Sequence, residues 1–292
     1  MSASPWLLAT RPKTLPAAAV PVWVGAMPAL LGYVEKPGSW WLFVCTLVSC
    51  LCIQIATNLF NDAIDHEKGA DTDARLGPKR VTASGLLSKR AVMGGALGFC
   101  ALAAAVAFPM IQARGWPIVG IGVVSLFFAY GYTGGPFPLA YRGMGEMFVI
   151  LFFGFVAVLG SYFVQTGELG SRSIWILGAQ SGLYSSVLIA INNLRDRAED
   201  KGTGKRTLAV SFGKTFARWE IAAFCLLPSL LFLWVGQHDW RALLALLISL
   251  PLASLITFLV CKNEPGPSYN KFLAFGALQL LLFGALSPLA MG

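Results

Sequence analysis

Nine apolar stretches of about 20 residues each leave this chain few ways to fold. A helix of about 20 residues crosses the roughly 30 Å hydrocarbon core of a bilayer. Most of the intervening links are short and polar. The stretches cover residues 16–33, 40–61, 91–111, 116–133, 146–165, 174–193, 219–236, 241–261 and 271–290. The pattern predicts an all-α integral membrane bundle of about nine transmembrane helices, forming a single domain over residues 1–292.

Composition agrees with a membrane protein and excludes several function classes. Hydrophobic residues make up 56% of the chain and charged residues only 12%, whereas soluble domains are about 25% charged. All six cysteines lie inside apolar stretches without a CxxC pair, and the two histidines are far apart, so neither a zinc nor a haem site is expected. No P-loop and no usable GxGxxG motif is present, which leaves ATP-driven transport unsupported.

The distribution of Lys and Arg predicts the orientation of the chain. With the N-terminus in the cytoplasm, eighteen of these residues fall on the cytoplasmic side and four on the other. Short cytoplasmic loops carry such an excess. The formal net charge of +8 is then explained largely by topology, and no nucleic-acid partner is needed. We expect a multi-pass protein of the inner (cytoplasmic) membrane with a cytoplasmic N-terminus.

The second apolar stretch ends in a cluster of amides and acids. Asn58, Asp62 and Asp65 are spaced i, i+4 and i+7, so a helix presents them on one face; Asp71 and Asp73 follow. Acids at the end of a membrane helix are expensive to desolvate and indicate a functional site. They require a cation.

A second cluster repeats this arrangement about 130 residues later. Asn192, Asp196 and Asp200 are spaced i, i+4 and i+8 and again close an apolar stretch. Carboxylates from two helices, with positions left open, suit Mg²⁺ bridged to a substrate phosphate. A solvated helix end would explain one such acid. It explains less well two matched clusters, which together with the flanking residues hold eight of the fourteen acids.

Basic residues follow each cluster, and their side chains suit phosphate oxygens. The positive-inside bias alone could account for any one of them. The preferred candidates for binding a diphosphate are Lys13, Arg80, Lys205 and Arg206. A phosphate site at the mouth of an apolar, aromatic bundle suits a substrate with a diphosphate head and a hydrocarbon tail, which is an isoprenyl diphosphate.

These motifs resemble a known family. Asn58-x-x-Asn-Asp-x-x-Asp65 and Asp196-x-x-x-Asp200 are similar to the paired aspartate-rich motifs of the UbiA superfamily of intramembrane prenyltransferases, which are nine-helix proteins that use Mg²⁺. Further segments look like the 1,4-dihydroxy-2-naphthoate polyprenyltransferases of menaquinone synthesis. They are Arg11-Pro-Lys-Thr-Leu-Pro16, Tyr132-Thr-Gly-Gly-Pro136, Gly143-Met-Gly-Glu146, Asn192-Asn-Leu-Arg-Asp196 and Gly204-Lys-Arg-Thr-Leu208. Arg80-Val-Thr-Ala-Ser-Gly85 departs from the Gln-Lys-Gly-like sequence of some members, and this leaves the acceptor open.

The resemblance implies a mechanism and assigns roles to residues. Asp62 and Asp65 would hold one Mg²⁺, and Asp196 and Asp200 another. Asn58 and Asn192 would assist them, and Lys13, Lys205 and Arg206 would stabilise the leaving pyrophosphate. Tyr132 would offer its ring to the allylic cation, although aromatic residues at interfaces are commonly membrane anchors. Glu146 would orient an acceptor hydroxyl or cap its own helix.

Two groups of alternatives stay open. Within the enzyme class, the aromatic acceptor could be 4-hydroxybenzoate, homogentisate, a chlorophyll precursor or haem. In another class, a cation-coupled transporter could use the same acids to bind its coupling ion. The position of the clusters at one membrane face, with phosphate-type basic companions, favours the enzyme.

Overall fold

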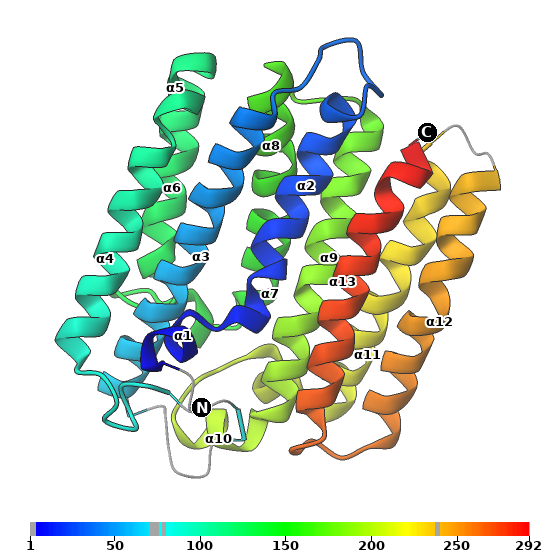
Figure 1. The fold of residues 1–292 in the computed structure, drawn as a ribbon. Helices are drawn as coiled ribbons and strands as arrows, with labels where there is room; N and C mark the ends of the chain where they lie inside the picture. The colour runs from blue at the N-terminus through cyan, green and yellow to red at the C-terminus, as the bar shows by residue number, and fades with distance from the viewer. Residues whose placement is uncertain (1–3, 70–75, 78–79, 237–239, 292) are drawn as a thin grey trace.

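The computed structural model describes residues 4–69, 76–77, 80–236 and 240–291, and every regular element in these residues is a helix. The helices stand side by side in one bundle (Figure 1). In chain order they are α1 (Pro5–Thr10), η1 (Pro12–Thr14), α2 (Pro16–Leu30), α3 (Trp40–Glu67), α4 (Lys89–Val106), α5 (Phe108–Arg114), α6 (Trp116–Gly131), η2 (Leu139–Tyr141), α7 (Gly145–Val149), the π-helix η3 (Ile150–Val156), α8 (Ala157–Thr166), α9 (Arg172–Arg195), α10 (Arg197–Gly202), α11 (Leu208–Leu231), η4 (Phe232–Trp234), α12 (Trp240–Lys262) and α13 (Tyr269–Met291).

The bundle has the length and composition of a multi-pass membrane protein. Among the described residues, seven helical segments are long and apolar enough to cross a membrane. The shorter apolar helices α2 and α6 lie where the other two crossings were predicted. The N-terminus lies at one end of the bundle and the C-terminus at the other (Figure 1). The all-α membrane fold predicted from the sequence is therefore confirmed.

Two predicted boundaries differ from the structure, each for a local reason. The stretch expected to begin near residue 219 begins at Leu208, because the Thr207 side chain caps the helix by accepting from the Val210 N–H. Gly213, with a φ of 89°, then separates this first turn from the rest of α11. The second acidic cluster does not lie on one uninterrupted helix, since α9 ends at Arg195 and Asp196 (φ −91°, ψ 7°) joins it to α10.

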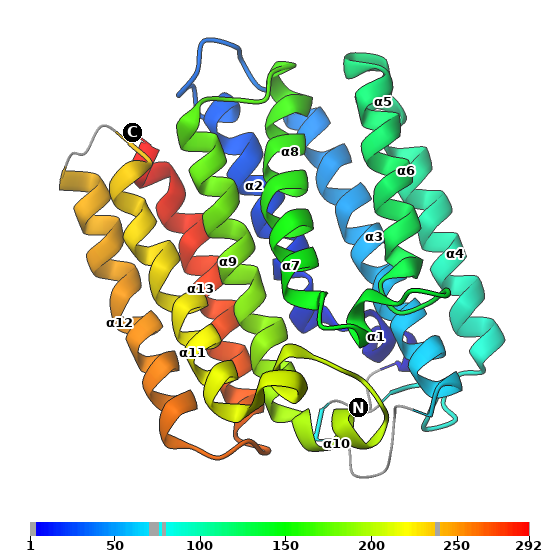
Figure 2. The same cartoon turned by 180° about the vertical axis from the view of Figure 1, so that it is seen from behind.

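The π-helix η3 packs closely against α9 through glycines. A Cβ added at Gly182 would lie 2.7 Å from the Ile150 carbonyl oxygen, and one added at Gly154 would lie 2.6 Å from that of Gly178. Such small residues let membrane helices approach each other. Helices α7, η3 and α8 follow one another in a single column (Figure 2). This column faces α3 and α6 across the cavity described below.

Candidate active site

Asn58 ties the first acidic cluster to the start of the chain. It is 3% exposed, and its side-chain amide donates to the Thr10 carbonyl at 3.0 Å and to the Thr14 hydroxyl at 2.9 Å. Gln54, one turn earlier on α3, donates to the Asn58 side-chain oxygen at 3.4 Å. Buried amides need such partners, so the segment before α2 is held against the end of α3.

Asp62 is only 2% exposed and is held by backbone groups. Its two carboxylate oxygens accept from the N–H groups of Val81, at 3.2 Å, and Thr82, at 2.9 Å. Hydrogen bonds to the ionised form compensate for the loss of water around a buried carboxylate. The turn that begins at Arg80 is thus fastened to the helix end that carries the acids.

Asp65 is 7% exposed and has side-chain partners. One of its carboxylate oxygens accepts from the Arg80 guanidinium at 2.9 Å, and the other accepts from the Tyr141 hydroxyl at 2.8 Å. Arg80 is itself 8% exposed. A buried charge pair needs additional hydrogen bonds to offset desolvation, and Tyr141 supplies one.

The two acids of the second cluster have different surroundings. The Arg195 guanidinium donates to both oxygens of Asp196, at 2.7 and 2.6 Å. Asp200 has one oxygen 3.5 Å from the Lys205 ammonium, and its other oxygen is buried without a hydrogen-bond partner among the described residues. Burial raises the pKa of Asp200 to about 6; Lys205 opposes this effect, and the neighbouring charges of Asp196 and Glu199 add to it.

The two clusters meet at one end of the bundle (Figure 1). Tyr141 donates its hydroxyl to Asp65, and the Lys205 ammonium lies 5.9 Å from the centroid of its ring. Lys205 in turn pairs with Asp200. The Lys68 ammonium lies 4.2 Å from the same ring centroid. A chain of direct contacts therefore joins an acid of α3 to an acid of α10.

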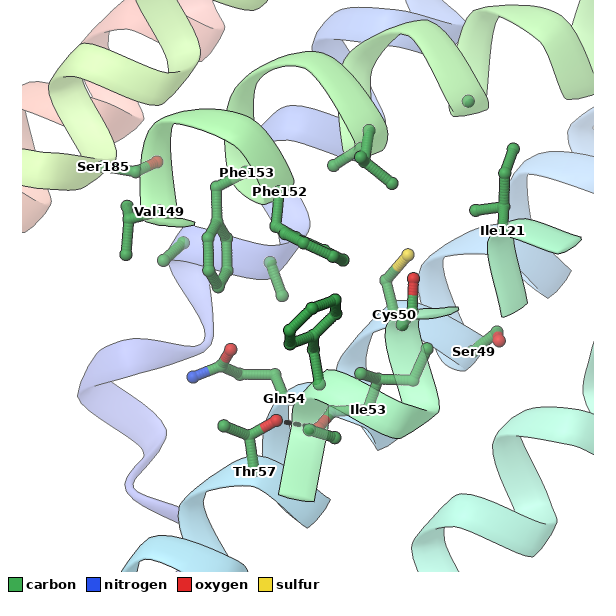
Figure 3. Close-up of a pocket in the computed structure, with 18 of the residues that line it drawn as sticks. Ser49, Cys50, Ile53, Gln54, Thr57, Ile121, Val149, Phe152, Phe153 and Ser185 are labelled. Atoms are coloured by element: carbon green, nitrogen blue, oxygen red, sulfur yellow. Dashed lines mark hydrogen bonds between the residues drawn. The ribbon is translucent and has the colours of Figure 1, made fainter. Parts of the chain in front are cut away.

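A cavity of about 320 Å³ opens between α2, α3, α6, η3, α8 and α9. Its lining is mostly apolar, and α3 contributes residues from Thr46 to Asn61, about 22 Å along the helix axis. Phe152 and Phe153 face Cys50, Ile53 and Gln54 across the cavity (Figure 3). Amides and hydroxyls gather where α3 approaches its acidic end. They include Thr14, Gln54, Thr57, Asn58, Asn61, Tyr132 and Asn192. Further hydroxyl residues line other parts of the cavity, namely Thr46, Ser49, Ser125, Ser161 and Ser185.

An aromatic cluster lines the cavity next to these polar groups. Phe148 and Phe152 stack with ring centroids 4.2 Å apart. Phe128 lies 5.3 and 5.5 Å from them, and Tyr132 lies 5.3 Å from Phe148. π-Helical segments frequently occur at functional sites, and here η3 carries Phe152 into the cluster. Aromatic faces attract cations without offering a nucleophile.

Comparison with known proteins agrees with this geometry. Residues 18–282 match the UbiA prenyltransferase family. The chain belongs to this family. It is 31% identical over 301 residues to 1,4-dihydroxy-2-naphthoate octaprenyltransferase of Haemophilus influenzae, covering 98% of this chain and 95% of the relative. It is 37% identical to the enzyme of the same name from Bacillus subtilis, covering 75% and 68%.

Solved structures share the UbiA fold. A UbiA homologue from Archaeoglobus fulgidus, solved with GPP and Mg²⁺, matches with a TM-score of 0.68 at 17% identity, covering 99% of each chain. The apo structure of a homologue from Aeropyrum pernix matches with a TM-score of 0.71 at 16% identity, covering 94% of this chain and 96% of that one. The family match, together with the long apolar helices, makes this protein a multi-pass membrane prenyltransferase.

The structure of this prenyltransferase brings some of the residues selected from the sequence into the cavity. Asn58, Asn192 and Tyr132 line it. The four aspartates and their cations, Arg80 and Lys205, gather at the end of the bundle that the polar lining approaches. Asp71, Asp73, Arg75 and Lys79, which also follow the first cluster, lie outside the described residues.

The remaining three selected residues, Lys13, Arg206 and Glu146, are not part of the cavity lining. Lys13 and Arg206 are exposed. Lys13 directly precedes Thr14, which binds Asn58. Glu146 is 2% exposed and accepts from the Asn193 amide at 2.6 Å, while its other oxygen is buried without a described hydrogen-bond partner. Glu146 lies in the first turn of α7, where a negative charge interacts favourably with the helix dipole. This position is compatible with the helix-capping alternative.

Sequence reasoning missed several residues of this site. Asn61 is part of the first motif but was assigned no role; it lines the cavity and accepts a hydrogen bond from Thr133. Phe148 and Phe152 lie in the apolar stretch 146–165, and no sequence signal distinguishes them from its other apolar residues. Tyr141 lies in the short 3-10 helix η2 between α6 and α7, and nothing in its spacing indicates a contact with Asp65.

The oxygen donors of this site fit Mg²⁺. The described residues contain no group of three or more acidic, imidazole or thiol side chains that would form a complete metal site by itself. Mg²⁺ in enzymes is commonly held by one or two carboxylates together with substrate phosphates, and the buried, unpartnered oxygen of Asp200 is such a donor. Desolvation opposes the ionised carboxylate, and a cation there would favour it.

Proposed function

We propose that this enzyme transfers a polyprenyl group from a polyprenyl diphosphate to 1,4-dihydroxy-2-naphthoate, with loss of the carboxylate, to give demethylmenaquinone in its reduced, hydroquinone form. One observation carries the proposal: the acids and cations of two motifs gather at the end of the bundle where an apolar cavity with an aromatic lining presents its polar groups. The diphosphate needs the polar end, and the hydrocarbon tail needs the cavity. The acceptor is suggested by the names of the relatives described above.

The four aspartates would hold the metal ions that bind the donor diphosphate. We assign Asp62 and Asp65 to one Mg²⁺ and Asp196 and Asp200 to a second. When bound, Mg²⁺ neutralises the phosphate oxygens and stabilises pyrophosphate as a leaving group. Lys13, Arg80, Lys205 and Arg206 would bind the remaining oxygens, because charge-assisted hydrogen bonds to phosphate are strong and directional.

The cavity would protect the reacting carbon from water. As the allylic C–O bond breaks, its electron pair leaves with pyrophosphate, and the rings of Tyr132, Phe128, Phe148 and Phe152 face the resulting positive charge. The electron-rich ring of the acceptor then forms the new C–C bond. Breaking the bond to the carboxylate releases CO₂ and returns an electron pair to the ring, which restores aromaticity.

We also propose that the site faces the cytoplasm and that residues 1–292 form one prenyltransferase domain. The eighteen to four distribution of Lys and Arg supports the orientation. Support for a single domain comes from the family match over residues 18–282. A count of nine crossings would require α2 and α6, at 15 and 16 residues, to span the bilayer together with the seven longer segments.

One assay tests this function. Purified protein is incubated with Mg²⁺, a long-chain prenyl diphosphate and, in parallel, 1,4-dihydroxy-2-naphthoate, 4-hydroxybenzoate or homogentisate, and the products are analysed by mass spectrometry. We expect a prenylated, decarboxylated product from the naphthoate, and none in excess EDTA. Product from another acceptor alone would replace the proposed substrate. Ion-dependent solute uptake by vesicles without pyrophosphate release would favour a transporter.

A further inference from the structure

Tyr141 is the last residue of η2, in the connection between α6 and α7, and it contacts the loop that follows the second acidic cluster. Its carbonyl oxygen accepts from the Arg206 N–H at 3.1 Å. Two residues later, Gly143 has a φ of 69°, and a Cβ there would lie 3.1 Å from the Arg206 carbonyl oxygen. The positive φ and the close approach both favour glycine. The backbone around Tyr141 is therefore positioned by the second cluster's own loop.

The side chain of Tyr141 reaches the first acidic cluster. Its hydroxyl donates to one oxygen of Asp65 at 2.8 Å, and the other oxygen accepts from Arg80 at 2.9 Å. Because the carboxylate has only two oxygens, these two donors together determine the orientation of its plane. A hydrogen bond to a charged group of this kind corresponds to about a tenfold or larger change in an equilibrium constant.

The ring of Tyr141 positions two lysines. The Lys68 ammonium lies 4.2 Å from the ring centroid and the Lys205 ammonium 5.9 Å from it, both within the range of a cation–π interaction. Lys68 also donates to the Thr133 carbonyl at 2.7 Å. An ammonium has three N–H donors, so this one described hydrogen bond leaves Lys68 able to bind an anion. The ring thus holds one cation from each motif's loop beside the acids.

We propose that Tyr141 is a positioning residue that couples the two acidic motifs. Its hydroxyl orients Asp65, its ring spaces Lys68 and Lys205, and its backbone is fastened to Arg206. Carboxylates and cations from both motifs are thereby presented to one metal-bound diphosphate. This inference rests on the proposed function above, because it takes the diphosphate of that reaction as the ligand of the coupled site.

Two substitutions separate the two parts of this role. Tyr141→Phe removes the hydroxyl and keeps the ring. The Mg²⁺ requirement is measured, in the presence of inorganic pyrophosphate, as the Mg²⁺ concentration that gives half of the maximal rise in unfolding temperature. For Tyr141→Phe, we expect this concentration to increase about tenfold. The KM for the prenyl diphosphate at saturating Mg²⁺ should stay near the wild-type value. Tyr141→Leu also removes the ring, and we expect the KM for the donor to rise as well. Tyr33→Phe, in the loop at the opposite end of the bundle, is the matched control and should change neither value.

The thermal measurement needs no turnover, so a wild-type protein that binds Mg²⁺ and pyrophosphate without transferring a prenyl group would contradict the proposed function alone. The Tyr141 proposal is overturned if Tyr141→Phe leaves the Mg²⁺ requirement unchanged. If Tyr141→Phe lowers the unfolding temperature in EDTA but leaves the Mg²⁺ requirement unchanged, Tyr141 acts only on stability, and the proposal is again overturned. A tenfold shift in Mg²⁺ requirement with an unchanged donor KM is the result that supports it.

Discussion

Asp196 and Asp200 are four residues apart and carry the same charge, yet their partners predict different effects of substitution. Asp196 is bound by the Arg195 guanidinium through two hydrogen bonds. Asp200 has one ammonium at 3.5 Å and one oxygen without a described partner. Substitution of Asp200 should therefore lower activity through the metal site alone. Substitution of Asp196 should lower both activity and stability.

For Asp200→Asn, we expect prenyl transfer to fall by more than about 100-fold, because even the outer partners of metal ligands affect activity by about 10–100-fold. The fold should be retained. Burial raises the pKa of Asp200 to about 6. A carboxyl group with a raised pKa stabilises the folded protein only at low pH, and this contribution is lost as the pH rises through 6. At pH 7, the ionised carboxylate of Asp200 therefore adds no stability that Asp200→Asn could remove. Pyrophosphate release and the unfolding temperature in detergent measure the two effects. Near-normal turnover would exclude Asp200 as a metal ligand.

For Asp196→Ala, we expect a loss of stability of about 3 kcal/mol, at the lower end of the range for breaking a buried ion pair. The Arg195 side chain is 1% exposed and would keep only the Asn270 side-chain oxygen, at 2.7 Å, among its described side-chain partners. The unfolding temperature should be lower than that of Asp200→Asn. Equal unfolding temperatures for the two variants would show that the Arg195 pair contributes little to the fold.

At this scale, spacing in the sequence predicted the acids but not all of their partners. Asn58, Asp62 and Asp65 follow helical spacing, and α3 carries all three. Tyr141 lies 76 residues after Asp65, in a connection whose course depends on how α6, α7 and the loop after α10 pack together. Local pattern contains no information about such a contact, so the sequence could not indicate it.

Among the elements, the π-helix η3 lines the cavity and packs closely against α9. Gly182 is one of the close points of this contact, and a Cβ there would lie 2.7 Å from the Ile150 carbonyl oxygen and 2.9 Å from its Cα atom. Backbone atoms cannot move aside as a flexible side chain can. The two helices would therefore have to separate if residue 182 were larger.

We expect Gly182→Ala to destabilise the protein by about 1–3 kcal/mol, as overpacking does in well-packed cores. The unfolding temperature in detergent should fall accordingly. Gly120→Ala on α6 is the matched control, because nothing lies within 4 Å of a Cβ at that position. If both variants unfolded at the wild-type temperature, the close contact between η3 and α9 would not matter for stability.

The length of the apolar stretches in the sequence predicted the helices correctly, but it did not predict all of the residues at which they begin and end. Each of the nine expected stretches corresponds to a helical segment in the described part of the chain. The early start of α11 depends on the Thr207 cap and the conformation of Gly213. The break at Asp196 coincides with the bidentate contact from Arg195. Hydropathy cannot detect such capping and side-chain effects.

At the scale of the whole molecule, the orientation in the membrane determines which side supplies the substrates. Helix α10, which contains Lys201, lies at the end of the bundle that carries the acidic motifs, and the connection between α2 and α3, which contains Lys36, lies at the opposite end (Figure 1). In a cysteine-free background, a membrane-impermeant maleimide should label Lys36→Cys in intact cells and Lys201→Cys only after the membrane is opened. The reverse pattern would place the active site on the outer side.

In the proposed mechanism, both acidic motifs bind a single diphosphate through Mg²⁺. The most direct test is isothermal titration of a non-reactive prenyl thiodiphosphate into wild-type, Asp65→Asn and Asp200→Asn proteins, with and without Mg²⁺. With Mg²⁺, we predict that each substitution weakens binding at least about tenfold, and that neither weakens it when Mg²⁺ is absent. If either variant bound the compound as tightly as the wild type in the presence of Mg²⁺, that motif would not contact the diphosphate and the account would be contradicted.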